Sequence, residues 1–531
     1  MTWRHYLRAE SRSPTFLWRM MIAILLTGAM VGAVVPRIAS RPERSDASWM
    51  VGVVAAGRFE EVAPHIDALF DSRQTRLPRL LSALPALHAI SRIARARGET
   101  PLGDVRGRLA VMEIDQTERD IALALWDSLS RETPSERLEE LTTAEPPLRY
   151  AHWALGIYWK QRGHPTRAAE AYQREGRFAE ASPSRRRALE IYVRQQDIGE
   201  LERLETMPGY AQQFPPAAVA LVAAEREQWW RLWWILPTYE WSHLATGPMV
   251  MAALTALFWL IFCLHAGQVT PPAETRWWLC VMAIGLGVVS IWPTDYLIFW
   301  QERVWNLAET GDLAGGLRFY ILGVGLREEL SKLVCLLPLL PWLVRRGKPL
   351  ETLIVSACVG LGFAAAENTQ YFAETQGASS VSRFLTANFF HMAATGLIGL
   401  AICRAIWHPR NSAAEFLALF TVIVAAHGLY DALISLPDLA GYQIGSTIIY
   451  VLLCYQFFQE LRAARSTRAE MISLTATFLF AVSCLGAVTF VYLSANVGWQ
   501  DAWKILAPEA IGMAVMVYLF LREMPETLVT V

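Results

Sequence analysis

Residues 324–334 read Val-Gly-Leu-Arg-Glu-Glu-Leu-Ser-Lys-Leu-Val, and they lie inside an apolar segment that extends from residue 317 to residue 344. A charged side chain at the centre of a bilayer helix costs about 2.5–3.5 kcal/mol on insertion scales. Three later apolar segments also contain ionisable side chains, namely Glu367, His391, and His427 with Asp431. Such groups must face one another or a water-filled cavity. We therefore expect a helical membrane protein with one polar site inside its bundle.

The composition supports a membrane protein. Of the 531 residues, 53% are hydrophobic and 18% are charged, which is too apolar for an ordinary soluble protein. The formal net charge of −1 argues against nucleic acid as a partner, because phosphate binding needs a basic surface. All seven cysteines lie in apolar segments, so we interpret them as small hydrophobic residues and not as disulfide or thiolate metal sites.

Ten apolar segments are long enough to cross a bilayer, and they predict an all-α polytopic bundle. The first, residues 20–35, has only a weak cleavage pattern after it, which favours an uncleaved signal anchor. The other nine run near 245–266, 277–298, 317–344, 350–372, 383–407, 413–436, 441–461, 471–494 and 504–522. The predicted domains are an N-terminal segment with the anchor (1–36), a polar helical domain (37–243), a membrane core (244–465) and two additional spans (466–531).

The polar domain of residues 37–243 is rich in arginine and helical in pattern. Leu155-Gly156 followed by Gly163, Ala168 and Tyr172 resembles a tetratricopeptide helix pair, in which small residues let two helices pack closely beside an aromatic ring. Residues 56–63 and 189–204 could be degenerate copies, and the alternative is an irregular helical domain. Either arrangement predicts a domain that docks a protein partner or senses a signal.

Basic residues in the short loops predict the orientation. Counted from a cytoplasmic N-terminus, the cytoplasmic loops contain the clusters at 345–348 and 462–468, whereas the opposite loops contain isolated basic residues such as Arg303 and Arg383. Both termini are therefore expected in the cytoplasm and the polar domain outside it. Four tryptophans within residues 229–234 predict a segment at the membrane surface.

Spacing along the helices predicts two ion pairs. Glu328 and Lys332 are four residues apart in the favourable order and can pair, which leaves Glu329 aimed at the cavity as a base. Distortion of the helix could reverse the roles of the two glutamates. His427 and Asp431 are also four residues apart, so the carboxylate could orient the imidazole.

The helix rise predicts that the ionisable residues lie at one level. Counted from the loops, Glu329, Glu367, His391 and His427 reach a similar depth, in the outer half of the membrane. Independent helices have no reason to agree in this way, which favours a single site.

The four motifs, in this order and on separate spans, resemble the PrsW family of intramembrane proteases over about residues 240–460. They are Glu-Glu-x-x-Lys at 328–332, Phe-x-x-x-Glu-Asn at 363–368, a single histidine at 391 and His-Gly-x-x-Asp at 427–431. That family is similar in turn to the CAAX-prenyl endopeptidase and bacteriocin-immunity proteins. The resemblance implies a protease core at 244–465 in a bacterial cytoplasmic membrane, which hydrolyses membrane-anchored proteins near the outer side, including an anti-sigma factor.

The resemblance also implies the site residues. The expected catalytic residues are Glu328, Glu329, Glu367, His391 and His427, and the expected supporting residues are Lys332, Asn368 and Asp431.

Two catalytic routes stay open. Glu367, His391 and His427 could bind Zn²⁺ as a His₂Glu set with a position left for water. Alternatively a glutamate, Glu329 by preference, activates water without a metal, while His427 stabilises the oxyanion. The sequence has no H-E-x-x-H motif, so we slightly prefer the metal-free route.

Two other functions are alternatives to proteolysis. A proton- or ion-coupled transporter also places carboxylates and histidines in the membrane, but the sequence shows no inverted repeat of broken helices. A non-catalytic scaffold would use the polar domain to bind a partner. The expected partners are membrane-anchored protein substrates, the lipid bilayer and a protein on the polar domain, with no nucleic acid.

Overall fold

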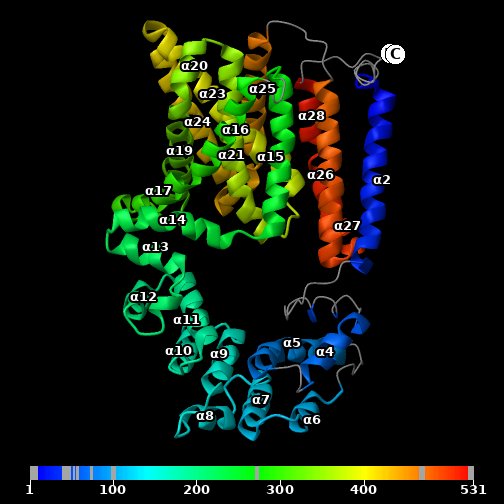
Figure 1. The fold of residues 1–531 in the computed structure, drawn as a ribbon, viewed down its shortest axis with the longest axis vertical. Helices are drawn as coiled ribbons and strands as arrows, with labels where there is room; N and C mark the ends of the chain where they lie inside the picture. Colours follow the sequence, from blue (N-terminus) through cyan, green and yellow to red (C-terminus); the bar gives the residue numbers. More distant parts are fainter. Residues whose placement is uncertain are drawn as a thin grey trace. The chain divides into compact units, whose positions relative to one another are not determined.

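The computed structural model describes residues 10–38, 50–51, 54, 59–71, 76–96, 103–269, 274–465 and 473–523. Over these residues the chain forms helices and turns and no strand, which confirms the all-α prediction (Figure 1). The chain divides into two compact units. Residues 40–235 form the first, and residues 1–39 together with 236–531 form the second, which we call the membrane unit.

The described residues of the first unit form helices connected by turns. They are η1 (Phe59–Glu61), α4 (Ala63–Leu69), α5 (Leu77–Ala96), α6 (Val105–Ala110), α7 (Gln116–Leu129), α8 (Glu136–Thr143), α9 (Ala151–Gln161), α10 (Pro165–Glu175), α11 (Ser182–Gln195), α12 (Ile198–Glu205), η2 (Ala211–Gln213) and α13 (Pro216–Glu225). The tryptophan-rich helix α14 (Trp229–His243) begins in this unit and ends in the other.

The helices α9 and α10 pack against each other, as the pattern of small residues predicted. Tyr172 lies so close to Gly156 that a Cβ there would be 2.7 Å from the ring. The buried carboxylate of Glu175 accepts hydrogen bonds from the backbone N–H groups of Tyr150 (2.6 Å) and Trp153 (3.3 Å), which fixes the start of α9. A tetratricopeptide repeat stays a prediction, and residues 56–58 of one proposed copy lie outside the described residues.

Among the residues that the structure describes, eight helical segments are long and apolar enough to cross a membrane. They are α2 (Pro14–Ile38), α15 (Thr246–Ala266), α16 with α17 (Thr275–Val289 and Ile291–Trp305), α21 (Pro349–Glu374), α22 with α23 (Ser380–Leu385 and Ala387–Trp407), α24 (Pro409–Ser435), α25 (Ile444–Ala464) and α26 (Leu474–Val497). A bent pair, α27 (Trp499–Gly512) and α28 (Ala514–Glu523), meets the same criteria when it is taken as one span with a 44° bend. The eight segments overlap eight of the ten predicted spans.

The predicted long helix at 317–344 is broken into several pieces. They are α18 (Leu313–Arg318), a π-helical stretch η3 (Phe319–Gly325), α19 (Leu326–Leu336), a 3₁₀ turn η4 (Leu337–Leu339) and α20 (Leu340–Arg346). The turn η4 contains Pro338, whereas the π-helical stretch contains no proline and was not predicted. π-helical turns occur often at functional sites, and this one leads directly into the charged residues of α19.

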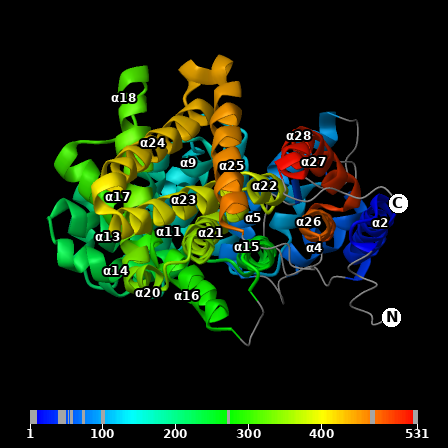
Figure 2. The same ribbon diagram turned by 90° about the horizontal axis from the view of Figure 1, so that it is seen from above.

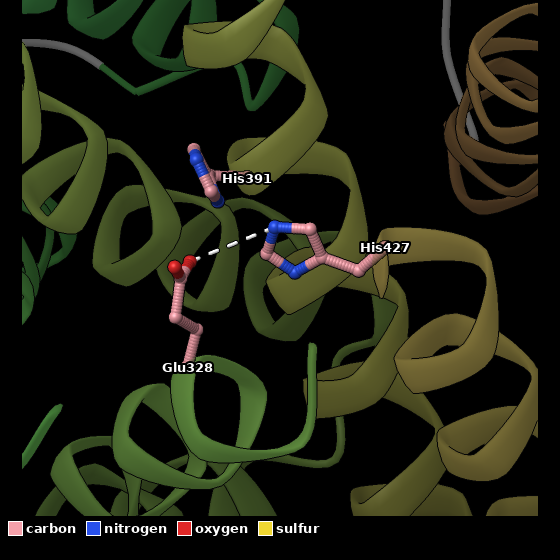
Figure 3. A group of neighbouring side chains, drawn as sticks. All are labelled: Glu328, His391 and His427. Carbon is pink, nitrogen blue, oxygen red and sulfur yellow. Dashed lines mark ion pairs between the residues drawn. The ribbon is translucent and has the colours of Figure 1, made fainter. Parts of the chain in front are cut away.

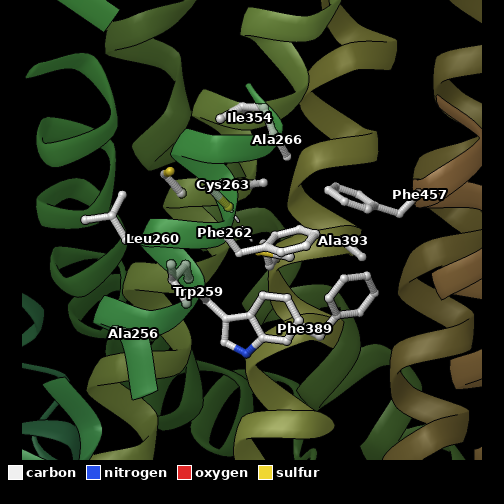
Figure 4. Packing of buried hydrophobic residues seen from close by; sticks show 14 of the residues in the cluster. Ala256, Trp259, Leu260, Phe262, Cys263, Ala266, Ile354, Phe389, Ala393 and Phe457 are labelled. Carbon is white, nitrogen blue, oxygen red and sulfur yellow. Dashed lines mark hydrogen bonds between the residues drawn. The ribbon is translucent and has the colours of Figure 1, made fainter. Parts of the chain in front are cut away.

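The helix α21 lies at the centre of the membrane unit. It packs against α15, α16, α19 and α23, and Figure 2 shows it among α15, α16 and α23. Every residue from Glu351 to Ala364 is buried. Next to it, the rings of Trp259, Phe389 and Phe457 form an aromatic core (Figure 4). Glu367 follows this buried stretch by less than one turn, where α21 becomes partly exposed.

Two glycines allow η3 and α24 to approach backbone to backbone. A Cβ at Gly325 would lie 2.4 Å from the carbonyl oxygen of Val424, and one at Gly428 would lie 2.4 Å from the carbonyl oxygen of Tyr320. Side chains of any size are therefore excluded at both positions. Because α19 follows η3 directly and His427 precedes Gly428, this contact sets the distance between the charged residues of the two helices.

Replacing Gly428 with alanine should push α24 away from η3, because the added Cβ would meet backbone atoms. Overpacking of this kind costs typically about 1–3 kcal/mol, so the variant should unfold at a lower temperature than the wild type in the same detergent. Gly441→Ala is the matched control, since nothing lies within 4 Å of its added Cβ. Equal unfolding temperatures for Gly428→Ala and the wild type would contradict the close approach.

Candidate functional site

Four helices of the membrane unit bring the predicted site residues together. The residues are Glu328, Glu329 and Lys332 on α19, Glu367 and Asn368 on α21, His391 on α23, and His427 and Asp431 on α24. A continuous series of polar contacts connects them across the helices. The single cluster agrees with the matching depths counted from the sequence.

The ammonium group of Lys332 lies at the centre of these contacts. Its side chain is fully buried, and its Nζ lies 2.7 Å from Oε1 of Glu329 and 2.8 Å from Nδ1 of His391. The same nitrogen lies 4.2 Å from the centroid of the Phe363 ring, a cation–π contact. An ammonium group only donates hydrogen bonds. Nδ1 of His391 is therefore the acceptor, and the ring proton lies on Nε2.

The predicted ion pair between Glu328 and Lys332 is present at 3.6 Å, but the adjacent Glu329 is the closer partner of Lys332, at 2.7 Å. Glu329 was expected to be the free base, but its side chain is 0% exposed, and one oxygen, Oε1, accepts from both Lys332 and His427. Glu328 lies farther from Lys332, at 3.6 Å, and 11% of its side chain is exposed. Both glutamates are within reach of a lysine three or four residues later, and His427 on the neighbouring helix decides between them.

His427 is oriented by Glu329 from another helix. Its Nδ1 donates to Oε1 of Glu329 at 2.8 Å, because a carboxylate only accepts. Its Nε2 then faces two carboxylates, Oδ2 of Asp431 at 3.5 Å and Oε2 of Glu328 at 3.6 Å. The predicted contact between His427 and Asp431 is present, but the hydrogen bond that fixes the ring comes from Glu329.

Glu367 is held by Arg383, a residue that was expected in a loop. Its Oε2 accepts from Nη2 of Arg383 at 2.8 Å and from Nε2 of His391 at 3.1 Å. Nε of Arg383 also donates to Oδ1 of Asn368, and its guanidinium group lies 3.6 Å from the centroid of the Tyr371 ring. Asn368 donates in turn to Asn388 at 2.6 Å.

Arg383, Tyr371 and Asn388 were therefore missed as members of the site. Arg383 was counted as an isolated basic residue of an outer loop, although the predicted span 383–407 begins with it and the helical segment of the structure begins three residues earlier, at Ser380. A basic residue at that position, 16 residues after a membrane glutamate, was the available signal.

Three of the residues form a group that could hold a metal ion. Glu328, His391 and His427 each offer one ligand atom, and these atoms all lie within 4.8 Å of one another. Figure 3 shows the carboxylate of Glu328 facing the ring of His427, with His391 beside them. Glu367 was the predicted third member of this group, and in the structure Glu328 takes that position. Glu367 is instead paired with Arg383.

Residues 275–458 match the family described as PrsW family intramembrane metalloprotease. The match confirms, over this segment, the resemblance found from the four motifs, and it contains every predicted site residue. The similarity to the PrsW family is therefore shown for this segment, and the relation to the CAAX-prenyl endopeptidases stays a prediction. No curated protein and no solved structure matches the chain.

The donor set fits the metal that the family description implies. Two imidazoles and one carboxylate are a common ligand set of catalytic zinc, and Oε2 of Glu328 is a buried oxygen without a hydrogen-bond partner among the described residues. His427 donates a hydrogen bond from Nδ1, the ring nitrogen that does not face Glu328, to the carboxylate of Glu329. Metal-binding histidines are usually oriented in this way. Nε2 of His391 could bind a metal only with the ring proton on Nδ1, and Lys332 would then lose its acceptor on His391 and keep its contacts with the glutamates and with the ring of Phe363.

Metal analysis of the purified protein should find about one divalent ion per chain after dialysis against zinc. His427→Ala removes one of three ligands and should weaken binding by at least about 10–100-fold, the loss seen even for residues that only orient a ligand. The exposed His408 is the matched control, and His408→Ala should keep the wild-type stoichiometry. Binding that is unchanged in His427→Ala would contradict the assignment of this group.

Proposed function

We propose that this protein is an intramembrane endopeptidase that hydrolyses peptide bonds of membrane-anchored proteins. The observation that carries the proposal is the group of Glu328, His391 and His427, whose ligand atoms lie within 4.8 Å of one another between helices of a membrane bundle. The similarity of residues 275–458 to the PrsW family supports intramembrane proteolysis. The eight apolar helices support a multi-pass membrane protein.

Glu328, His391 and His427 would hold the metal, and zinc is the ion that we propose. The bound metal would supply Lewis acidity toward the scissile carbonyl group and a water molecule. We no longer prefer the metal-free route, because the family description names a metalloprotease and Glu328 completes a suitable ligand set. In a metal-free enzyme Glu328 would itself take the proton from water, since its carboxylate is the more exposed of the two on α19.

Glu367 is the group that we propose to accept the proton of the attacking water molecule. Its Oε2 lies beside Nε2 of His391, and Arg383 keeps the carboxylate in place at 2.8 Å. Glu329 and Lys332 orient the two histidines and do not contact substrate in this proposal. In this proposal Glu328 and Glu367 take part in the reaction, whereas the fully buried Glu329 and Lys332 only position the histidines.

The finer features of the function are also proposals. We propose ten spans, with 313–346 and the bent α27–α28 pair as the two additional ones, and both termini in the cytoplasm of a bacterium. The arginine clusters in alternate loops support this orientation. The unit of residues 40–235 would then lie outside the cytoplasm and recruit a substrate or partner, and an anti-sigma factor is one candidate substrate.

Glu328→Gln should abolish proteolysis while the protein stays folded, because the amide can neither bind a metal strongly nor accept a proton. The measurement compares the N-termini of membrane proteins in cells that express the wild type or Glu328→Gln. Termini that depend on the wild type identify a single-span substrate, and its cleavage should fall at least about 100-fold in the variant.

The control for this comparison is Glu415→Gln, which changes an exposed glutamate on α24. It should cleave like the wild type. Identical N-termini in Glu328→Gln and wild-type cells would refute the protease, and an ion flux through the purified protein that Glu328→Gln removes would favour the transporter.

A further inference from the structure

The short helix α22 carries the arginine that holds Glu367. Arg383 donates from Nη2 to Oε2 of Glu367 at 2.8 Å and from Nε to Oδ1 of Asn368. Its guanidinium group also lies over the ring of Tyr371. The position of α22 therefore determines where the carboxylate of Glu367 lies relative to His391.

Helices that follow the family match hold α22 in place. The carboxylate oxygen Oε1 of Glu509, on α27, accepts a hydrogen bond from the backbone N–H of Ser382 at 3.1 Å. The hydroxyl of Thr489, on α26, lies 2.6 Å from the hydroxyl of Ser380. Both partners come after residue 458, where the match to the PrsW family ends.

The loop before α22 is covered from the same side. The ring of Tyr492, on α26, lies so close to Gly377 that a Cβ there would be 3.1 Å from it. Gly377 has a φ of +82°, which disfavours any larger residue. Three contacts from α26 and α27 thus reach the six residues from Gly377 to Ser382, which lead directly to Arg383.

Other contacts hold the far end of α22. The indole N–H of Trp259 donates to the carbonyl oxygen of Phe384 at 2.8 Å, and the hydroxyl of Tyr450 donates to the carbonyl oxygen of Leu385. The end that precedes Arg383 is therefore the one whose placement depends on α26 and α27. A hydrogen bond from a backbone N–H to a carboxylate is stronger than one to a neutral acceptor, which makes Glu509 the principal contact.

We propose that Glu509 is a positioning residue for the peptidase site, acting through Ser382 and Arg383 on Glu367. The inference rests on the proposed function, because it assigns Glu509 to the same reaction. If Glu509 has this role, α26 and α27 contribute to the peptidase site, although they lie outside the segment that matches the PrsW family.

The test measures cleavage of the single-span substrate found in the comparison of N-termini, by full-length protein in detergent. Glu509→Ala should lower kcat about tenfold, as expected for about 1.4 kcal/mol, and leave KM close to the wild-type value. Glu509→Gln keeps an oxygen that accepts from Ser382 and should restore most of the rate. Lys504→Ala changes an exposed residue of the same helix and serves as the control.

A double-variant comparison distinguishes positioning from general stability. If Glu509 acts through Arg383, Glu509→Ala should have no further effect on kcat in an Arg383→Ala background. Amide hydrogen exchange of residues 380–386 should be faster in Glu509→Ala and normal in Glu509→Gln. Should Glu509→Ala fail to fold, Thr489→Val, which removes only the contact to Ser380, should lower kcat about threefold.

Several outcomes would overturn the inference. Cleavage that requires Glu328 but is unchanged in Glu509→Ala would overturn the inference on Glu509 and leave the proposed function standing. An equal effect of Glu509→Ala on kcat in the wild-type and the Arg383→Ala backgrounds would do the same. Absence of cleavage by the wild type would overturn the proposed function and this inference together.

Discussion

The rest of the membrane unit depends on the interactions of one buried ammonium group, that of Lys332. A charge without partners in this environment would cost several kcal/mol. Lys332 avoids that cost through Glu329 on its own helix, His391 on α23 and the ring of Phe363 on α21. Three helices are thereby fixed around one atom, and Glu329 extends the contact to His427 on the fourth.

The surrounding fold brings the backbones close enough for these contacts. Gly325 and Gly428 allow η3 to touch α24, and Gly360 allows α21 to approach the carbonyl of His391, where a Cβ would lie at 2.1 Å. The buried stretch of α21 and the aromatic core around Trp259 keep the helices in this register. The polar contacts therefore depend on these glycines, because larger side chains at the glycine positions would hold the helices too far apart for the contacts to form.

The sequence predicts most of the membrane helices and predicts that the ionisable residues within them lie together, because both features depend on local signals. Apolar length defines the spans, and ionisable residues within them have few alternatives to meeting one another. It could not decide between Glu328 and Glu329, because Lys332 reaches both and the choice depends on His427, about a hundred positions later. The role of Arg383 was missed for a similar reason. Its partners Glu367 and Asn368 lie on another helix, and an arginine near a loop is more often an orientation signal.

The broken helix at 313–346 also depends on tertiary contacts. Pro338 marks the 3₁₀ turn in the sequence, but the π-helical stretch before α19 carries no proline and forms where Gly325 meets α24. The contacts from Glu509 and Thr489 to α22 connect residues more than a hundred positions apart, and no motif announces them. Interactions of this range are visible only once the helices are packed.

The most direct test of the central claim is the thermal unfolding of three proteins in one detergent: the wild type, Lys332→Met, and Lys332→Met with Glu329→Gln. Removing one partner of a buried ion pair costs about 3–5 kcal/mol, whereas replacing both is often close to neutral. Lys332→Met should therefore unfold at a much lower temperature than the wild type. The double variant should recover most of the loss, because the glutamine oxygen still accepts from His427. A Lys332→Met protein as stable as the wild type, or a double variant less stable than Lys332→Met, would contradict the account.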